Sequence, residues 1–504
     1  MINAYVNREN LEYDIYALLK AFYPGDEVSI NVVNDGEAVE ESGRVPSFYD
    51  VKVCTDKVSC SYYDPDDGRG TEGPDDGPLG KAVYFDSEEI MAPGRAVLKD
   101  AMKRCIYRCA SIVSGRTLPW GILTGIRPVK LAMTRINEGD SDEQTGKLLK
   151  YRYLMSDEKA SLSIEIAHKE RDILKKIDRY GGYSLYIGIP FCPTTCLYCS
   201  FTSYPIARYA SLVDDYISGL KKELDLTYEI FKGRSPDSVY IGGGTPTTLA
   251  PDKLKQLIGY LGKLFDFDKV LELTVEAGRP DSIDKEKLMT LKELGVSRIS
   301  INPQTMNEKT LRLIGRRHTV GEFKNAFALA RECGFDNINT DIILGLPGEG
   351  LDEVRNTMEE LKTLDPESIT VHSMAIKRAA GMAEYLKEHE EIKSINTPEM
   401  LKCTDSTARA LGMSPYYLYR QKNMAGNFEN VGYAKEGCEG IYNILIMEEL
   451  QSIIACGAGT VSKRVYTDGL IERCDNVKDV ELYLSRLDEM LERKKKLFCN
   501  FSDT

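Results

Sequence analysis

Short apolar runs alternate with longer amphipathic segments between residues 183 and 373. The runs begin at residues 183, 238, 271, 297, 337 and 368. Because successive starts lie 26 to 55 residues apart, each interval has room for a crossover helix of about ten residues and its loops. The pattern predicts six parallel strands in an α/β fold, as either a doubly wound sheet or a barrel. In both arrangements ligands bind at the carboxyl ends of the strands.

The chain on either side of this region has a different pattern. The first 120 residues carry apolar or alternating runs at 27–33, 47–54 and 81–85, expected to be antiparallel strands, and a helical stretch at 95–113. After residue 400 come an expected helix at 398–411, a tyrosine-rich run at 414–434 and a terminal helix at 480–497. We therefore predict an N-terminal α+β module at 1–170, a core at 171–400 and a mainly helical C-terminal module at 401–504.

Composition narrows the class of protein. Of the 504 residues 42% are hydrophobic and 28% are charged, which is ordinary globular usage and argues against a fibrous or disordered chain. No apolar run approaches the roughly 20 residues of a membrane span, and the first residues are acidic where an export signal is basic and then apolar. We expect a cytoplasmic protein without a membrane span. The net charge of −13 disfavours nucleic acid as a partner.

Three cysteines stand close together after the first predicted strand. The segment PFCPTTCLYCSF places Cys192, Cys196 and Cys199 in C-x3-C-x2-C spacing. Three thiolates on one short loop suit a cubane iron–sulfur cluster, which takes four ligands and would keep one iron open. Two alternatives are three buried apolar cysteines and a zinc site completed by a distant residue. Both are less favoured, because the loop contains Pro and Thr and because zinc more often uses paired C-x2-C motifs or histidine.

Polar residues and glycines follow the later strands. The segment GGGTPT at 242–247 begins with three glycines, which have no side chain to keep a ligand away from the backbone. Glu276 ends the third predicted strand, Gln304 ends the fourth and Asp341 lies on the fifth. Each feature alone is weak evidence, but together they predict a ligand site at one edge of the sheet.

The cysteine spacing, with the aromatic Tyr198 before the last cysteine, resembles that of the radical S-adenosylmethionine (SAM) enzymes. The resemblance implies a partial TIM-like (β/α)6 barrel. It also implies a 4Fe-4S cluster on the three cysteines, with the amino and carboxylate groups of SAM on the open iron. One-electron cleavage of SAM would then give a 5′-deoxyadenosyl radical that abstracts hydrogen.

Several strings resemble a narrower family, the oxygen-independent coproporphyrinogen III oxidases. These are YIGIPFC, GGGTPT, INPQT, IGRRHT and NTDIILGLPGE, while PYYLYRQKNMAGNFENVGYA and IIACGAGTVSK are similar to the HemZ-like subgroup. The resemblance implies SAM contacts by Tyr186, Tyr198, Gly243, Gly244, Thr245, Glu276, Gln304, Arg316 and Asp341, with the last two at the ribose. Two positions depart from the HemN branch: Gly188 replaces a histidine and Phe201 replaces a further cysteine.

The implied activity is anaerobic oxidative decarboxylation of two propionates of coproporphyrinogen III, giving protoporphyrinogen IX in haem biosynthesis. An electron donor and an electron acceptor would be partners, and the C-terminal module would face the tetrapyrrole. Arg420 and Lys422 are candidates for binding propionate, or else packing charges, while His372 lies either at the barrel mouth or in the core. Rival functions are methyl transfer to haem with ring opening, a non-catalytic haem chaperone and, more distantly, tRNA modification.

Overall fold

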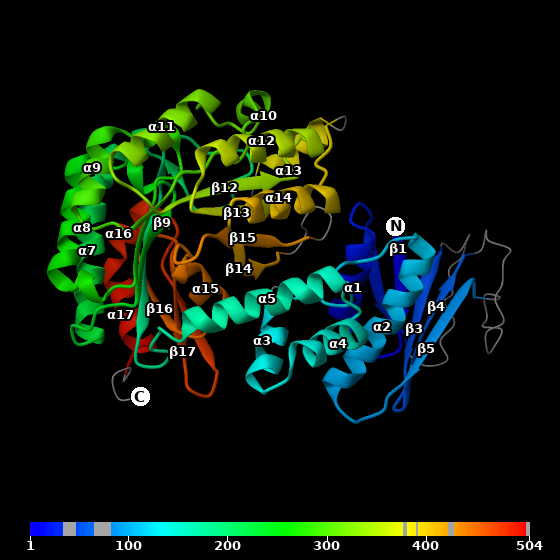
Figure 1. The fold of residues 1–504 in the computed structure, drawn as a ribbon. Coiled ribbons are helices and arrows are strands. Elements are labelled where there is room, and N and C mark those ends of the chain that lie inside the picture. Colours follow the sequence, from blue (N-terminus) through cyan, green and yellow to red (C-terminus); the bar gives the residue numbers. More distant parts are fainter. Residues whose placement is uncertain are drawn as a thin grey trace. The chain divides into compact units, whose positions relative to one another are not determined.

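The computed structural model describes residues 1–33, 47–64, 82–125, 127–375, 381–389, 392–421 and 428–499. The chain divides into two compact units (Figure 1). The N-terminal unit comprises residues 1–167 and 420–428, and the main unit comprises residues 168–419 and 429–504. Within the described residues, no helix is both long enough and apolar enough to cross a membrane.

The N-terminal unit is built on a five-stranded sheet in the order β2-β1-β3-β4-β5. Its strands are β1 (Ile2–Val6), β2 (Val28–Val32), β3 (Phe48–Val53), β4 (Lys57–Tyr63) and β5 (Tyr84–Glu89). Strands β3, β4 and β5 are antiparallel as expected, but β1 is parallel to both β2 and β3. The expectation of an antiparallel β2 is wrong because helix α1 (Glu12–Phe22) connects β1 to β2 as a crossover.

Helices complete the N-terminal unit. They are α1, α2 (Arg95–Ser114), α3 (Val129–Asn137), α4 (Asp142–Tyr153) and the first part of α5 (Asp157–Leu174). Helix α2 confirms the helix expected at 95–113 and buries Cys105 and Cys109 against the sheet. Both are free thiols in an apolar core.

The main unit contains the six predicted parallel strands. They are β6 (Tyr183–Ile189), β9 (Ser238–Gly243), β10 (Glu272–Glu276), β11 (Arg298–Ser300), β12 (Ile338–Leu344) and β13 (Ser368–Ser373). They pair as parallel neighbours in chain order, which confirms the predicted β-α units. A short pair, β7 (Phe191–Cys192) with β8 (Tyr204–Pro205), follows β6.

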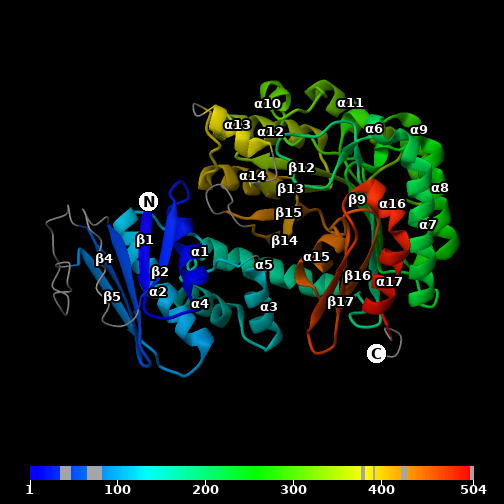
Figure 2. The same cartoon turned by 180° about the vertical axis from the view of Figure 1, so that it is seen from behind.

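Helices connect the parallel strands. They are α6 (Ile206–Tyr209), α7 (Val213–Ile230), α8 (Pro251–Leu264), α9 (Lys285–Glu293), α10 (Glu308–Leu313), α11 (Val320–Glu332) and α12 (Leu351–Leu364). Helices α7, α8 and α9 lie side by side along the outside of the sheet (Figures 1 and 2). The six parallel strands all run in the same direction, because every connection returns the chain to the end of the sheet where the previous strand began. The polar residues at their carboxyl ends therefore lie along one and the same end of the strands, which is called here the carboxyl edge of the sheet.

The C-terminal residues extend the same sheet at both edges, giving the order β14-β15-β13-β12-β11-β10-β9-β6-β16-β17-β18. The added strands are β14 (Ser414–Tyr419), β15 (Asn430–Ala434), β16 (Ser452–Cys456), β17 (Val461–Val465) and β18 (Ile471–Asp475). The remaining helices are α13 (Met382–Glu388), α14 (Pro398–Ala410), α15 (Ile441–Glu448), α16 (Val480–Ser485) and α17 (Leu487–Leu497). Strand β16 is parallel to β6, the strand that leads to the cysteine loop.

A glycine turn after β16 packs closely against β6. Gly457 has φ +106°, and a Cβ at this position would lie 2.4 Å from the carbonyl oxygen of Gly188. Tyr216 donates its hydroxyl to the same Gly188 oxygen at 2.7 Å. A Cβ on Gly188 would in turn lie 2.5 Å from Cγ2 of Thr460. This packing leaves no room at Gly188 for the histidine of the HemN branch.

We expect Gly457→Ala to lower the free energy of unfolding by more than about 1 kcal/mol, because it adds both a backbone penalty and a steric clash. Gly437→Ala is the matched control, since Gly437 has φ +80° with no atom within 4 Å of an added Cβ. Urea unfolding followed by circular dichroism measures both variants. Equal losses would show that the contact with Gly188 contributes nothing.

Candidate functional site

The three predicted cluster cysteines follow β6: Cys192 ends the two-residue strand β7, and Cys196 and Cys199 lie on the loop after it. Thr245 Oγ1 is 3.4 Å from Cys192 Sγ, and Arg279 Nη1 is 3.3 Å from Cys196 Sγ. The backbone N–H of Cys199 donates to the carbonyl of Cys196 at 3.1 Å, so these two residues share one turn. Burial raises the pKa of Cys192 to about 11 and also raises the pKa of Cys199. Metal binding would displace these thiol protons, because the thiolate is the ligand.

The donor set fits a cluster with sulfur ligands. Three cysteines come from one loop, and hydroxyl and guanidinium groups lie beside two of the sulfurs. Among the described residues, no three His, Cys, Asp or Glu side chains are placed to hold a single metal ion. Phe201, where the HemN branch has a further cysteine, is 74% exposed.

The glycine loop after β9 packs against the cysteine loop. Gly244 and Thr245 donate their backbone N–H groups to Ile189 and Phe191, both at 2.7 Å. A Cβ on Gly244 would lie 2.6 Å from the Phe191 carbonyl oxygen. The close approach that these glycines permit is therefore, in part, to the backbone that carries Cys192. Contact of Gly243, Gly244 and Thr245 with SAM stays a prediction.

Glu276 ends β10 with a half-buried carboxyl group. Tyr240 donates its hydroxyl to Glu276 Oε1 at 2.6 Å, and the carboxyl carbon lies 2.9 Å from where a Cβ on Gly242 would stand. Burial, together with the negative charge of Asp341, raises the pKa of Glu276 to about 7. This carboxyl group therefore changes charge near neutral pH.

Three tyrosine rings stack beside Glu276. The ring centroids of Tyr186 and Tyr240 are 6.0 Å apart, those of Tyr240 and Tyr442 are 4.7 Å apart, and those of Tyr186 and Tyr442 are 5.7 Å apart. Sequence reasoning found Tyr186 but missed Tyr240 and Tyr442. Tyr240 lies two residues before the glycine run on the same strand, a usable signal, whereas Tyr442 comes from the distant helix α15.

Asp341 on β12 is held by neighbouring amides. Its two carboxylate oxygens accept from Asn302 Nδ2 at 2.8 Å and Asn339 Nδ2 at 2.7 Å. His372 Nε2 lies 3.8 Å from Asp341 Oδ2, so His372 is at the site and not in the apolar core. Burial alone would raise the pKa of Asp341, but the interactions with His372 and Asn339 outweigh it and lower this pKa. Asp341 is thus an anion at neutral pH.

Gln304 adopts a conformation that is unusual for a residue with a side chain. Its φ is +69°, in the left-handed region. Its N–H donates to the Asp341 carbonyl at 3.0 Å, and its carbonyl accepts from Ile343 N–H at 2.9 Å. These bonds to β12 hold the strained turn at the edge where the candidate site lies.

Arg316 connects the cysteine loop to the strand ends. Its guanidinium donates to the Tyr198 hydroxyl at 3.0 Å and to the carbonyls of Gly278 and Asn302 at 3.0 and 2.9 Å. Because Asn302 also donates to Asp341, this asparagine joins the two residues predicted at the ribose. Sequence reasoning missed Asn302, although it stands two residues before Gln304 in the quoted string INPQT.

Of the two residues considered for binding propionate, Arg420 and Lys422, the structure describes only Arg420. Arg420 belongs to the N-terminal unit, is 3% exposed, and packs over the Trp120 ring while donating to the Leu123 carbonyl. It is a packing charge in this structure, and Lys422 lies outside the described residues. In the tyrosine-rich run, Tyr416 and Tyr417 are buried core residues.

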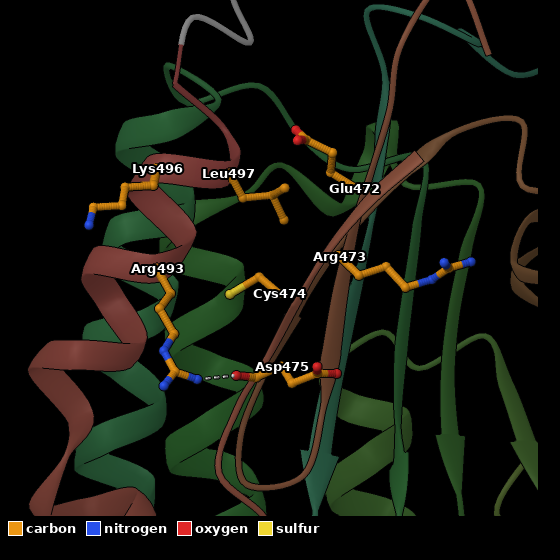
Figure 3. Close-up of a pocket in the computed structure, with 7 residues that line it drawn as sticks. All are labelled: Glu472, Arg473, Cys474, Asp475, Arg493, Lys496 and Leu497. Atoms are coloured by element: carbon orange, nitrogen blue, oxygen red, sulfur yellow. Dashed lines mark hydrogen bonds between the residues drawn. The ribbon is translucent and has the colours of Figure 1, made fainter. Parts of the chain in front are cut away.

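A separate hollow of about 450 Å³ lies between β18 and α17 (Figure 3). It is lined by Glu472, Arg473, Cys474, Asp475, Arg493, Lys496 and Leu497. Arg493 donates across it to the Asp475 carbonyl at 3.2 Å. None of the residues predicted to bind a cofactor lines this hollow, so it is distinct from the candidate site.

Comparison with known proteins places this arrangement of strands in a class. Residues 186–361 match the radical SAM superfamily. The coproporphyrinogen III oxidase HemN of Escherichia coli, described as a radical SAM enzyme, has the same fold, with a TM-score of 0.50 and 22% identity over 64% of this chain and 73% of HemN. The fold and the site therefore define a radical SAM protein, whose cofactors are a 4Fe-4S cluster and SAM.

Two curated relatives refine this class. The oxygen-independent coproporphyrinogen-III oxidase-like protein HemZ of Bacillus subtilis is 42% identical over 388 residues, 76% of this chain and 77% of the relative. The heme chaperone HemW of Bacillus subtilis is 39% identical over 197 residues, 38% of this chain and 51% of the relative. The chain belongs to the HemZ family of oxygen-independent coproporphyrinogen-III oxidase-like proteins, as the sequence resemblance indicated.

Proposed function

We propose that this protein is a radical SAM enzyme that decarboxylates two propionate side chains of coproporphyrinogen III to vinyl groups. Each propionate would lose one hydrogen atom, then CO2 and one electron, so an electron acceptor is required. When bound, the cluster and SAM supply a carbon-centred radical for the hydrogen abstraction. The observation that carries the proposal is the gathering of the cysteine loop, Glu276 and Asp341 at one edge of the sheet.

The side chains at this edge would bind and orient the cofactors. Cys192, Cys196 and Cys199 would hold the cluster. Glu276 and Asp341 would offer negative charge to the cationic groups and hydroxyls of SAM. The tyrosine wall formed by Tyr186, Tyr240 and Tyr442 would exclude water from the radical chemistry. Arg316 and Asn302 would hold the cysteine loop and Asp341 in fixed positions relative to each other through their hydrogen bonds.

The test is an anaerobic assay with protein reconstituted with iron and sulfide, SAM, a one-electron reductant and coproporphyrinogen III. We expect protoporphyrinogen IX, CO2 and 5′-deoxyadenosine. Cys196→Ala is the control, and we expect it to retain no cluster and form no product. A methylated linear tetrapyrrole in place of protoporphyrinogen IX would overturn the decarboxylase assignment.

A second candidate function is suggested by the similarity to the heme chaperone HemW. A chaperone would bind haem in stoichiometric amounts and release it without turnover. In the same assay it would form no substrate-dependent 5′-deoxyadenosine. Haem titration of the reconstituted protein, followed by visible absorption, therefore separates the two functions.

A further inference from the structure

Arg279 lies beside the cysteine loop, directly after β10. Its side chain is 3% exposed, and Nη1 is 3.3 Å from Cys196 Sγ and 3.3 Å from the Thr194 carbonyl oxygen. Nη2 donates to Thr194 Oγ1 at 3.1 Å. The guanidinium therefore binds the cysteine loop through its backbone, through a side chain and through the sulfur of a cluster ligand.

Asp281 holds this guanidinium in place. Arg279 Nε donates to Asp281 Oδ1 at 2.9 Å, and Nη2 donates to Oδ2 at 2.6 Å, which makes a bidentate pair. Although burial would lower the pKa of Arg279, the bond with Asp281 raises it. The group beside Cys196 is thus a fixed cation whose orientation is set by a neighbouring carboxylate.

We propose that Arg279 tunes the reduction potential of the cluster through its N–H donation to the Cys196 sulfur, with Asp281 offsetting part of its charge. The proposal rests on the proposed cluster site. In the reduction, one electron passes from a one-electron reductant to the cluster, and no covalent bond forms or breaks. The reduced cluster carries one more negative charge, which a nearby cation and a hydrogen bond to sulfur stabilise.

Removal of the Arg279 cation and removal of the Asp281 anion are expected to change the reduction potential of the cluster in opposite directions. Arg279→Gln removes the cation, so we expect the one-electron reduction equilibrium to become about tenfold less favourable, a potential about 59 mV lower. Asp281→Asn removes the opposing anion and keeps an acceptor for Arg279, so we expect a potential higher by a comparable amount. A side chain that only supports the loop would not give shifts of opposite sign.

The experiment is an anaerobic redox titration of the reconstituted full-length protein, followed by electron paramagnetic resonance of the reduced cluster, with iron and sulfide counted in each sample. Arg464→Gln is the matched control, because Arg464 is also a buried arginine but donates to the carbonyls of Leu497 and Cys499. We expect its potential to equal that of the wild type.

The possible outcomes separate this inference from the proposed function. A wild-type protein that takes up no cluster would overturn the proposed function and this inference together. A loaded wild type whose potential is unchanged by Arg279→Gln or by Asp281→Asn would overturn the inference alone. If Arg279→Gln does not load iron, Asp281→Asn decides: a higher potential supports the role of Arg279, and an unchanged one overturns it.

Discussion

Lys494→Met is expected to lower the free energy of unfolding by about 3–5 kcal/mol, because it leaves a buried carboxylate without its counter-charge. Lys494 on α17 and Glu223 on α7 form an ion pair with both side chains fully buried. Glu223 also accepts from the Gly457 N–H at 2.6 Å, the Tyr483 hydroxyl at 2.6 Å and Asn476 Nδ2 at 2.8 Å. One carboxylate thus connects α7 to the C-terminal helices and to the glycine turn that packs on β6.

The measurement for Lys494→Met is urea unfolding followed by circular dichroism. Fluorescence of Trp120, the single tryptophan, reports the N-terminal unit and serves as an internal reference. The double variant Glu223→Gln with Lys494→Met removes both charges, so we expect it to be more stable than Lys494→Met alone. If the double variant is less stable than Lys494→Met, the buried charge is not the cause of the loss.

Glu276→Gln is expected to stabilise the protein at alkaline pH while weakening SAM binding. The pKa of Glu276 is raised from 4.5 to about 7 in the folded protein. Its protonated form is therefore favoured by folding, and the associated stability is present below pH 4.5 and is lost as the pH rises to about 7. At about 1.4 kcal/mol for each pH unit, the wild type loses about 3 kcal/mol over this window, which the glutamine variant avoids.

Thermal or urea unfolding at pH 8 and pH 5 measures how the stability difference between Glu276→Gln and the wild type changes with pH. We expect the variant to be more stable than the wild type at pH 8, with the difference disappearing toward pH 5. Calorimetric titration with SAM at pH 8 should show weaker binding, because the variant has lost an anion at the site. Glu272→Gln, at the opposite end of β10, should leave SAM affinity unchanged. Greater stability with unchanged SAM affinity would place Glu276 outside the cofactor site.

The sequence predicted the parts of the fold that local spacing encodes. The six parallel strands were visible because apolar runs recur with intervals long enough for crossover helices. The three cysteines were recognisable because a ligand loop keeps them within eight residues of one another. The crossover from β1 to β2 was missed because the strand at 2–6 and helix α1 were not recognised, although the interval between the two strands has room for a crossover helix.

The contacts within the site were less predictable. Arg279 meets Cys196 across 83 residues of sequence, and Tyr442 on helix α15 stacks on Tyr240 of strand β9. Arg420 looked available for a carboxylate, but packing buried it against Trp120 in the N-terminal unit. Residues far apart in sequence meet only when the sheet order and the helix packing are in place, so no local pattern signals them.

By itself, the sequence determined the class of this protein: a parallel α/β core whose cysteine loop and polar strand ends are predicted to carry the cofactors. These features depend on neighbours along the chain and on strand periodicity. The tertiary structure decided which groups surround the sulfurs, which carboxyl group titrates near neutral pH and how the C-terminal helices anchor β6. Burial and charge pairing set those properties, and both arise only when distant segments pack together.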